Sequence, residues 1–344
     1  MVCMELFRIF ARKIITAMKV RSTVAKVTVC VPCFNEVDTI ALLYRTLVGV
    51  FNDIPSCDFE LLAVDDGSTD GTLDVLYGLN AEDSRVQVLS FSRNFGKEAA
   101  LMAAIDYAGG DCVVLMDADG QDPPELIPQM LHWWREGYDD VYARRTDRGR
   151  EGWLRRQLSL LFYDFMSKMT DVDMPSDVGD FRLLDRQVVL SLRELREVER
   201  YNKGLFSWVG YKKKELTFER ANRREGKSHF TLWKLANLAM AGITSFTAAP
   251  LRIWTLIGGV IAMGAFCFLI FYIAKTLIIG DPVQGFTTLV SIILFLGGIQ
   301  LLSVGILGEY IARLYSESKH RPMYVIKEQT STIPSRENRV NDKY

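Results

Sequence analysis

Residues 112–122, with the sequence CVVLMDADGQD, join an apolar run directly to a cluster of carboxylates and an amide. Three earlier segments have the same form, because the apolar runs at 27–33, 59–64 and 86–91 each end in polar residues. Amphipathic stretches at 36–51, 70–79 and 96–108 separate these runs. The alternation predicts an α/β domain, with a parallel sheet and helices on both of its faces. Ligands of such sheets bind beyond the carboxyl ends of the strands.

Polar residues follow all four predicted strands, at 32–36, 65–71, 92–97 and 117–122. A dinucleotide site would need GxGxxG after the first strand, and a P-loop would need GxxxxGKS or GxxxxGKT; neither is present there. The sequence therefore argues against a nicotinamide-dependent oxidoreductase and against a P-loop NTPase. Taken alone, the segment 65–71 is equally consistent with a turn that caps the next helix.

The segment 117–122 begins like a calcium-binding loop. Its sixth position is Asp122 rather than Gly and its twelfth is Pro128 rather than Glu, which excludes an EF-hand. What remains is a strand that ends in two carboxylates one residue apart, followed by Gln121. Such short sets of hard oxygen ligands hold a divalent ion whose other ligands come from substrate phosphates. The four segments together predict a site for a nucleotide diphosphate that carries a metal ion.

Composition narrows the class of protein. The 344 residues include 41 basic and 42 acidic side chains, which does not favour a nucleic-acid partner, and the length allows about two domains. The six cysteines show no spacing typical of secreted proteins. Cys30 and Cys33 form a CxxC at the end of a β-branched run, and no second pair completes a zinc site. Disulfides are not expected.

Two uncharged apolar runs predict a membrane hairpin. They cover 253–274 and 286–308, with 22 and 23 residues, and a turn at 280–282 separates them. A helix of 22 residues reaches about 33 Å, enough to cross a hydrocarbon core of about 30 Å. The less favoured alternative is that the two runs are helices buried in a protein core. Basic residues flank the pair at Lys234, Arg252, Arg313, Lys319, Arg321 and Lys327, whereas Lys275 is the one inside it. Both ends of the hairpin should therefore face the cytoplasm.

The remaining segments complete the expected organisation. Residues 1–25 combine basic and apolar side chains, as in an amphipathic arm on a membrane surface; a leader without function, with a true start at Met18, is the alternative. A catalytic domain would cover 26–228, an interfacial helix 229–251, two transmembrane helices 252–311, and a cytoplasmic tail 312–344. Arginines between 144 and 156, close to Trp153, could meet lipid headgroups or form a solvated basic face.

The motifs as a set resemble those of the GT-A-type, family-2 glycosyltransferases, which have a Rossmann-like nucleotide-binding catalytic domain. The matching elements are VPCFNE at 31–36, DDGS at 65–68, RNFGK at 93–97, DADGQDP at 117–123, VGDFRL at 178–183, GKS at 226–228 and LGEYI at 307–311. Together with the hairpin they look most like bacterial bactoprenol (undecaprenyl-phosphate) glucosyltransferases, and more distantly like dolichol-phosphate mannose synthase. The QxxRW motif and the extra membrane helices of processive synthases are missing, which favours transfer of a single sugar.

The resemblance implies roles for individual residues on the donor side. Pro32, Asn35, Glu36, Asp65 and Asp66 would hold the uridine and ribose, and Arg93 and Lys97 would approach the phosphates of the nucleotide. Asp117 and Asp119, with Gln121, would place Mg²⁺ or Mn²⁺ on the diphosphate, where the ion neutralises charge on the departing UDP.

On the acceptor side, the resemblance makes Asp180 the catalytic base or the carboxylate that orients the acceptor, in a loop with Arg182. Arg182 would hold an oxygen of the lipid phosphate; in isolation, the pattern Asp-Phe-Arg is more typical of a surface salt bridge. Arg144, Arg155, Ser159 and Lys227 are further candidates for contact with the acceptor phosphate.

The implied activity is transfer of glucose from UDP-glucose to undecaprenyl phosphate, with inversion, at the bacterial inner membrane. The lipid-linked sugar would serve cell-envelope glycan modification, such as that of lipopolysaccharide O-antigen. The family also implies a homo-oligomer, such as a tetramer, in contact with membrane lipids. An undecaprenyl-phosphate 4-deoxy-4-formamido-L-arabinose transferase is the rival enzyme. An inactive membrane scaffold or lipid-carrier-binding protein is the rival of another class.

Overall fold

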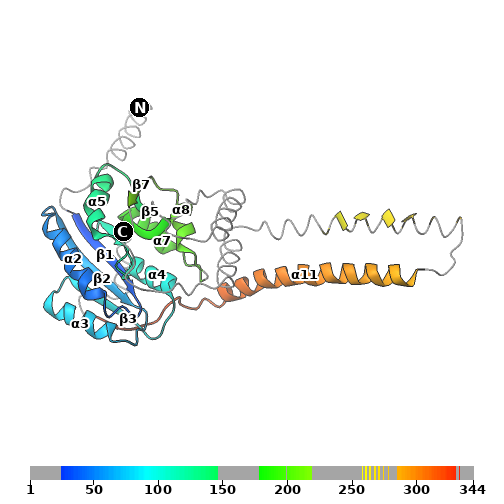
Figure 1. Ribbon diagram of the computed structural model, residues 1–344, viewed down its shortest axis with the longest axis horizontal. Helices are drawn as coiled ribbons and strands as arrows, with labels where there is room; N and C mark the ends of the chain where they lie inside the picture. Colours follow the sequence, from blue (N-terminus) through cyan, green and yellow to red (C-terminus); the bar gives the residue numbers. More distant parts are fainter. Residues whose placement is uncertain are drawn as a thin grey trace, which may run out of the picture.

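A computed structural model describes most of the predicted catalytic domain and the last long helix (Figure 1). The described residues are 25–145, 178–198, 200–218, 285–330 and 333, with isolated positions between 258 and 278. The expected amino-terminal arm, the interfacial helix, most of the first membrane span, and Arg155, Ser159 and Lys227 lie outside them. The expectations for those segments stay predictions.

Eight strands form one mixed sheet in the order β7-β5-β6-β4-β1-β2-β3-β8. Their bounds are β1 Ala25–Cys33, β2 Cys57–Asp65, β3 Val86–Phe91, β4 Cys112–Leu115, β5 Asp140–Arg145, β6 Val178–Asp185, β7 Lys213–Phe218 and β8 Ile326–Gln329. The four central strands β4, β1, β2 and β3 are parallel, as the sequence predicts. Strand β6 runs antiparallel to β4 and β5, and β8 runs antiparallel to β3.

Helices cover both faces of the sheet, which confirms the predicted α/β architecture (Figure 1). Their bounds are α2 Ile40–Asn52, α3 Thr72–Glu82, α4 Lys97–Tyr107, the short 3₁₀ helix η1 Pro124–Leu126, α5 Ile127–Arg135, α7 Arg186–Glu194, α8 Asn202–Trp208 and α11 Phe286–Ser318. Val29 of β1 packs in the same core as α2 and α5, whereas its neighbour Cys30 packs in the core that contains α4. Successive strand residues point to opposite faces, so a strand covered on both sides must be apolar throughout.

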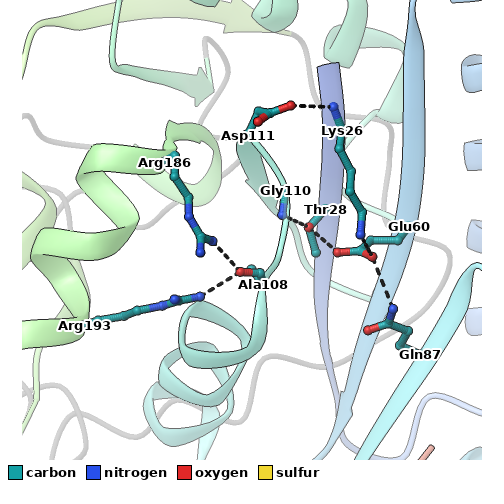
Figure 2. A network of polar contacts seen from close by, with 9 residues as sticks. All are labelled: Lys26, Thr28, Glu60, Gln87, Ala108, Gly110, Asp111, Arg186 and Arg193. Atoms are coloured by element: carbon teal, nitrogen blue, oxygen red, sulfur yellow. Dashed lines mark hydrogen bonds and ion pairs between the residues drawn. The ribbon is translucent and has the colours of Figure 1, made fainter. Parts of the chain in front are cut away.

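A polar network ties together the edge of the sheet where β1 and β4 begin (Figure 2). The Thr28 hydroxyl donates to Glu60 Oε1 at 2.6 Å and accepts from the Gly110 N–H at 2.8 Å. The Lys26 ammonium lies 2.6 Å from Glu60 Oε2. Because Glu60 is buried, its charge needs these partners. Together they fix the relative register of β1, β2 and the start of β4, and hence where the opposite ends of these strands lie.

Two segments differ from the expectations. Asp180 lies within strand β6 and not in a loop, because Leu183 and Leu184 of the same segment pair with β4 and β5. The expected cytoplasmic tail also returns to the domain: β8 pairs with β3, and Val325 accepts a hydrogen bond from the Ser92 N–H at 3.0 Å. Residues 326–329 therefore belong to the catalytic sheet.

Helix α11 begins at Phe286, as the apolar run predicts, and continues ten residues past the expected end at 308. Its portion Phe295–Ser318 has 24 residues, and an 18-residue stretch of it has a mean hydropathy of 1.5 and no buried residue. Among the described residues, this is the one helix long and apolar enough to cross a membrane. In Figure 1 it projects away from the sheet and its covering helices.

Candidate active site

A cavity of about 260 Å³ lies at the carboxyl ends of the central strands. Its walls come from all four polar segments that the sequence singles out, of which 65–71 contributes Asp66 alone. Ala100 of α4 completes the lining. The lining residues are Pro32, Cys33, Phe34, Glu36, Asp66, Asn94, Gly96, Lys97, Ala100, Asp117, Ala118 and Asp119. The prediction that these segments meet at one edge of the sheet is therefore confirmed.

Asp66 holds the loop after β3 against the loop after β2. Its Oδ1 and Oδ2 accept hydrogen bonds from the backbone N–H groups of Phe95 and Gly96, at 2.6 and 2.9 Å. Burial raises the pKa of the Asp66 carboxyl, while these two bonds act in the opposite direction. Next to it, Gly67 has a φ of +70°, and a Cβ there would lie 2.6 Å from the carbonyl carbon of Arg93. The two loops approach each other backbone to backbone, which only glycine allows.

Asp65 and Asn35, both expected to hold the nucleoside, form hydrogen bonds within the protein. Asp65 is buried; its Oδ1 accepts from the Ser68 N–H at 3.1 Å and its Oδ2 from the Ser90 hydroxyl at 3.0 Å. Asn35 adopts the left-handed conformation, with a φ of 57°, and its Oδ1 accepts from the Thr69 N–H at 2.9 Å. In this structure they shape the site, and neither lines the cavity.

Lys97 is the centre of charge in the site. Its Nζ lies 2.7 Å from Asp117 Oδ1, at the end of β4, and 2.6 Å from Asp180 Oδ2, on β6. Burial lowers the pKa of the Lys97 ammonium, but the two carboxylates outweigh burial and raise it above its usual value. Lys97 is therefore charged at neutral pH and holds together two carboxylates that would otherwise repel each other.

The two carboxylates respond differently to this environment. Burial raises the pKa of the Asp117 carboxyl, and Lys97 offsets only part of that effect. Burial acts on Asp180 in the same direction, but Lys97 and Lys203 outweigh it and leave the pKa of Asp180 below its usual value. Asp180 is therefore ionised at neutral pH. A carboxylate with a lowered pKa is a weak base but a strong hydrogen-bond acceptor.

Asp119 shares the wall of the cavity with Asp117 and Glu36. Burial raises the pKa of Glu36, and the charges of Asp119 and Asp117 add to the increase, so the three acids lie within reach of one another's fields. Within the described residues, no three His, Cys, Asp or Glu side chains are grouped closely enough to hold a metal by themselves. Two carboxylates, those of Asp117 and Asp119, supply hard oxygen ligands. Such a pair fits Mg²⁺ or Mn²⁺ when substrate phosphates supply the other ligands.

Gln121 is not one of the lining residues. It is buried, and its backbone N–H donates to Asp119 Oδ1 at 3.1 Å. Asp122 acts in a similar way, because its Oδ2 accepts from the Asp117 N–H at 3.1 Å. Both residues thus hold the turn that presents Asp117 and Asp119, a role that the spacing of the motif does not reveal.

The arginines expected at the phosphates lie elsewhere. Arg182 is 4% exposed, donates to Asp140 Oδ2 at 3.1 Å and stacks over the Phe206 ring at 4.0 Å, so its guanidinium is engaged within the domain. Arg93 is exposed and stacks 3.9 Å over Phe95, outside the cavity. Arg144 pairs with Glu215 of β7 at 3.3 Å. Lys97 is the cation in the cavity wall.

Comparison with known proteins identifies two matching family models and several similar chains. The Glycosyl transferase family 2 model matches residues 28–192, and the GtrB C-terminal hairpin model matches residues 249–314. The bactoprenol glucosyl transferase of Shigella phage SfV is 44% identical over 304 residues, which cover 88% of this chain and 99% of the relative. An uncharacterized glycosyltransferase of Synechocystis sp. is 42% identical over 303 residues, with coverage of 88% and 95%.

Among solved structures, the crystal structure of mannosyl-3-phosphoglycerate synthase from Rubrobacter xylanophilus is similar in fold. The match covers 63% of this chain and 71% of the synthase chain. The two share 22% sequence identity, with a TM-score of 0.43.

Proposed function

Because this chain belongs to glycosyl transferase family 2, we propose that it transfers glucose from UDP-glucose to the phosphate of undecaprenyl phosphate, or bactoprenol phosphate. An oxygen of the lipid phosphate attacks C1 of the glucose. The bond from C1 to the diphosphate oxygen breaks, its electron pair leaves with UDP, and the configuration at C1 inverts. The high identity to a relative with the name bactoprenol glucosyl transferase, over nearly its whole length, supports this choice of sugar and acceptor.

The observation that carries the proposal is the charged cavity wall made by Lys97, Asp117 and Asp119. The uridine and ribose would lie among Pro32, Glu36 and Asp66, and Lys97 would meet the diphosphate. Asp117 and Asp119 would hold Mg²⁺ or Mn²⁺, which when bound neutralises the negative charge that develops on the leaving UDP. A cavity with so many acids would repel a diphosphate without added cations, so a divalent ion suits this site.

Asp180 would orient the acceptor. The phosphate of a lipid monoester has a second pKa of about 6 and is largely dianionic at neutral pH, so it needs placement more than deprotonation. The lowered pKa of Asp180 agrees with that division of roles. Arg182 would act indirectly, because its pair with Asp140 joins β6 to β5 and so holds the strand that carries Asp180.

The return of the chain to the sheet supports a membrane topology with an even number of crossings. Strands β1 to β7 and β8 lie in one sheet and hence on one side of any membrane. An even number of crossings must therefore lie between β7 and β8. If α11 is one crossing, the apolar run at 253–274 would supply the second, and the basic flanks support a cytoplasmic location for the catalytic domain and both termini. The family also suggests a homo-oligomer.

The proposal is tested by incubation of the purified protein with undecaprenyl phosphate, Mg²⁺ or Mn²⁺, and a panel of nucleotide sugars. Mass spectrometry of the lipid fraction should show hexosyl-phosphoryl-undecaprenol with UDP-glucose. Exclusive use of another sugar nucleotide, such as the formamido-arabinose donor, would overturn the sugar assignment. If no donor yields a lipid product or metal-dependent release of UDP, the chain is a scaffold or a lipid-carrier-binding protein.

A further inference from the structure

A second cavity, of about 240 Å³, lies where α11 ends and the chain turns back to the sheet. Arg196 and Val198 line it from the segment after α7, and Glu317 lines it from the last turn of α11. His320, Arg321 and Tyr324 line it from the connection to β8. It shares no lining residue with the active-site cavity.

Hydrogen bonds from three segments hold the walls of this second cavity in place. The Tyr324 hydroxyl donates to Asp106 Oδ2 at 2.6 Å, and Arg196 donates to the same oxygen at 2.8 Å. Glu317 Oε1 accepts from the Val198 N–H at 2.7 Å, which joins α11 to the segment after α7. The cavity is therefore built from the catalytic domain and the long apolar helix together.

The cations of the second cavity have donors to spare. A guanidinium carries five N–H donors, and the bond to Asp106 uses one of those on Arg196. In the part of the chain that the structure describes, Arg321 forms no ion pair, and its side chain is exposed beside His320. The acids nearby, Asp106 and Glu317, already accept hydrogen bonds from the chain. Two arginines that converge on one cavity favour a ligand with phosphate oxygens.

The position of the second cavity, at the end of the apolar part of α11, indicates the source of that phosphate. Exposed apolar side chains continue along α11 to Leu314 and Tyr315, which are 69% and 62% exposed. Glu317 follows within one turn, and Lys319 stacks over the Tyr315 ring at 3.9 Å. Tyrosines and basic side chains of this kind mark the level of lipid headgroups at the end of a membrane helix.

We propose that the second cavity binds the phosphate of an anionic phospholipid headgroup in the cytoplasmic leaflet. Arg321 and Arg196 would contact the phosphate, and His320 would lie beside it. The inference rests on α11 as a membrane helix, but it does not depend on which sugar the enzyme transfers. Bound lipid would brace the joint between α11 and the catalytic domain.

The test is a binding titration of the purified full-length protein in a nonionic detergent, with native mass spectrometry as the readout. The probes are dihexanoyl phosphatidylglycerol, inorganic phosphate and dihexanoylglycerol, which lacks phosphate. We expect Arg321→Gln to weaken phosphatidylglycerol binding about tenfold, as expected for loss of one charge-assisted contact. Lys327→Gln, which removes the same charge from β8 outside the cavity, should change binding less than about twofold.

Equal binding to wild-type and Arg321→Gln protein would overturn the proposal, as would equal binding of the phosphate-free lipid. Inorganic phosphate that binds as tightly as phosphatidylglycerol would replace the lipid by free phosphate as the occupant. The glucosyl-transfer assay, carried out on the same preparation, keeps the two proposals separate. Lipid binding that depends on Arg321 in a protein without transfer would sink the proposed activity alone.

Discussion

At the scale of single residues, the chemistry of the site depends on one ammonium group. Lys97 begins α4, Asp117 follows β4 and Asp180 lies on β6, yet the Lys97 Nζ lies within 2.8 Å of carboxylate oxygens of both acids. Sequence motifs suggest separate roles for Asp117 and Asp180, in donor and acceptor binding. The shared Lys97 couples their charges, so a change at one alters the pKa of the other.

Substitution of Asp119 and of Asp180 should separate donor binding from turnover. We expect Asp119→Asn to weaken metal-dependent binding of UDP-glucose and turnover together, because an amide is a poorer ligand for a hard cation. Asp180→Asn should leave donor binding within a few-fold while turnover falls by roughly 10²-fold, the lower end of the usual range for acid–base residues. Calorimetric titration with Mn²⁺ and a rate assay measure the two effects, with circular dichroism as the control for folding. Near-normal turnover in Asp180→Asn would return Asp180 to a structural role.

Gly67 offers a test of the contact between the loops after β2 and β3. Gly71→Ala strains a φ of +93° but meets no atom within 4 Å, so it should cost about 1 kcal/mol. Gly67→Ala adds a collision with the backbone of Arg93 and Asn94, and should cost about 1–3 kcal/mol more. Thermal unfolding of both variants measures the difference. Equal losses of stability would mean that the two loops can move apart without cost.

At the scale of elements, β8 and the residues before it connect the long helix to the active site. Tyr324 stacks on Phe91 with ring centroids 5.1 Å apart, and Phe91 meets Phe95 edge to face at 5.7 Å. The Phe95 N–H in turn donates to Asp66 in the cavity wall. Strand β8 also covers the edge of β3, which would otherwise expose unpaired backbone groups. The segment after α11 therefore helps to support the wall of the cavity.

Tyr324→Phe should show that support in stability. The substitution keeps the ring and removes a hydroxyl that donates to the buried Asp106 carboxylate, so we expect a loss of about 1–3 kcal/mol. Tyr77→Phe is the matched control, because it removes an exposed bond to Glu328 of β8 at 3.2 Å and should cost less than about 0.5 kcal/mol. Chemical denaturation in detergent compares the two. Equal effects would show that the Tyr324 hydroxyl contributes no more than a surface contact.

At the scale of the whole molecule, one sheet is interrupted in sequence by a long apolar insertion. Residues 219–325 lie between β7 and β8 in the sequence, and within them α11 exposes apolar side chains along its length. Exposed apolar surface of this extent needs a partner, and a bilayer is the partner that suits a helix of this length. Both ends of the insertion must lie on one side of that bilayer.

Reporter fusions test this topology. A reporter after Tyr344 should report the cytoplasm, and one inserted at Asp281, where the sequence predicts a turn, should report the opposite side. A reporter after Phe218, at the end of β7, should agree with the first. Opposite locations for Phe218 and Tyr344 would mean an odd number of crossings, which cannot coexist with β8 in the sheet.

The local sequence is sufficient for the central strands, the cavity edge and the start of α11, because continuous apolar runs and the polar residues after them report burial directly. It is insufficient for β8. This strand, Ile326–Gln329, has only four residues, most of them exposed, and it forms by pairing with β3. Asp180 and Lys97 are 83 residues apart, and Arg182 and Asp140 are 42 apart, so strand order alone decides that each pair meets. The motifs indicate which residue types the site contains. Tertiary packing decides that Asp180 contacts Lys97 and that Arg182, two positions along the same strand, is buried. The physical reason is that pairing in a sheet joins distant segments, and no local periodicity encodes which of them become neighbours.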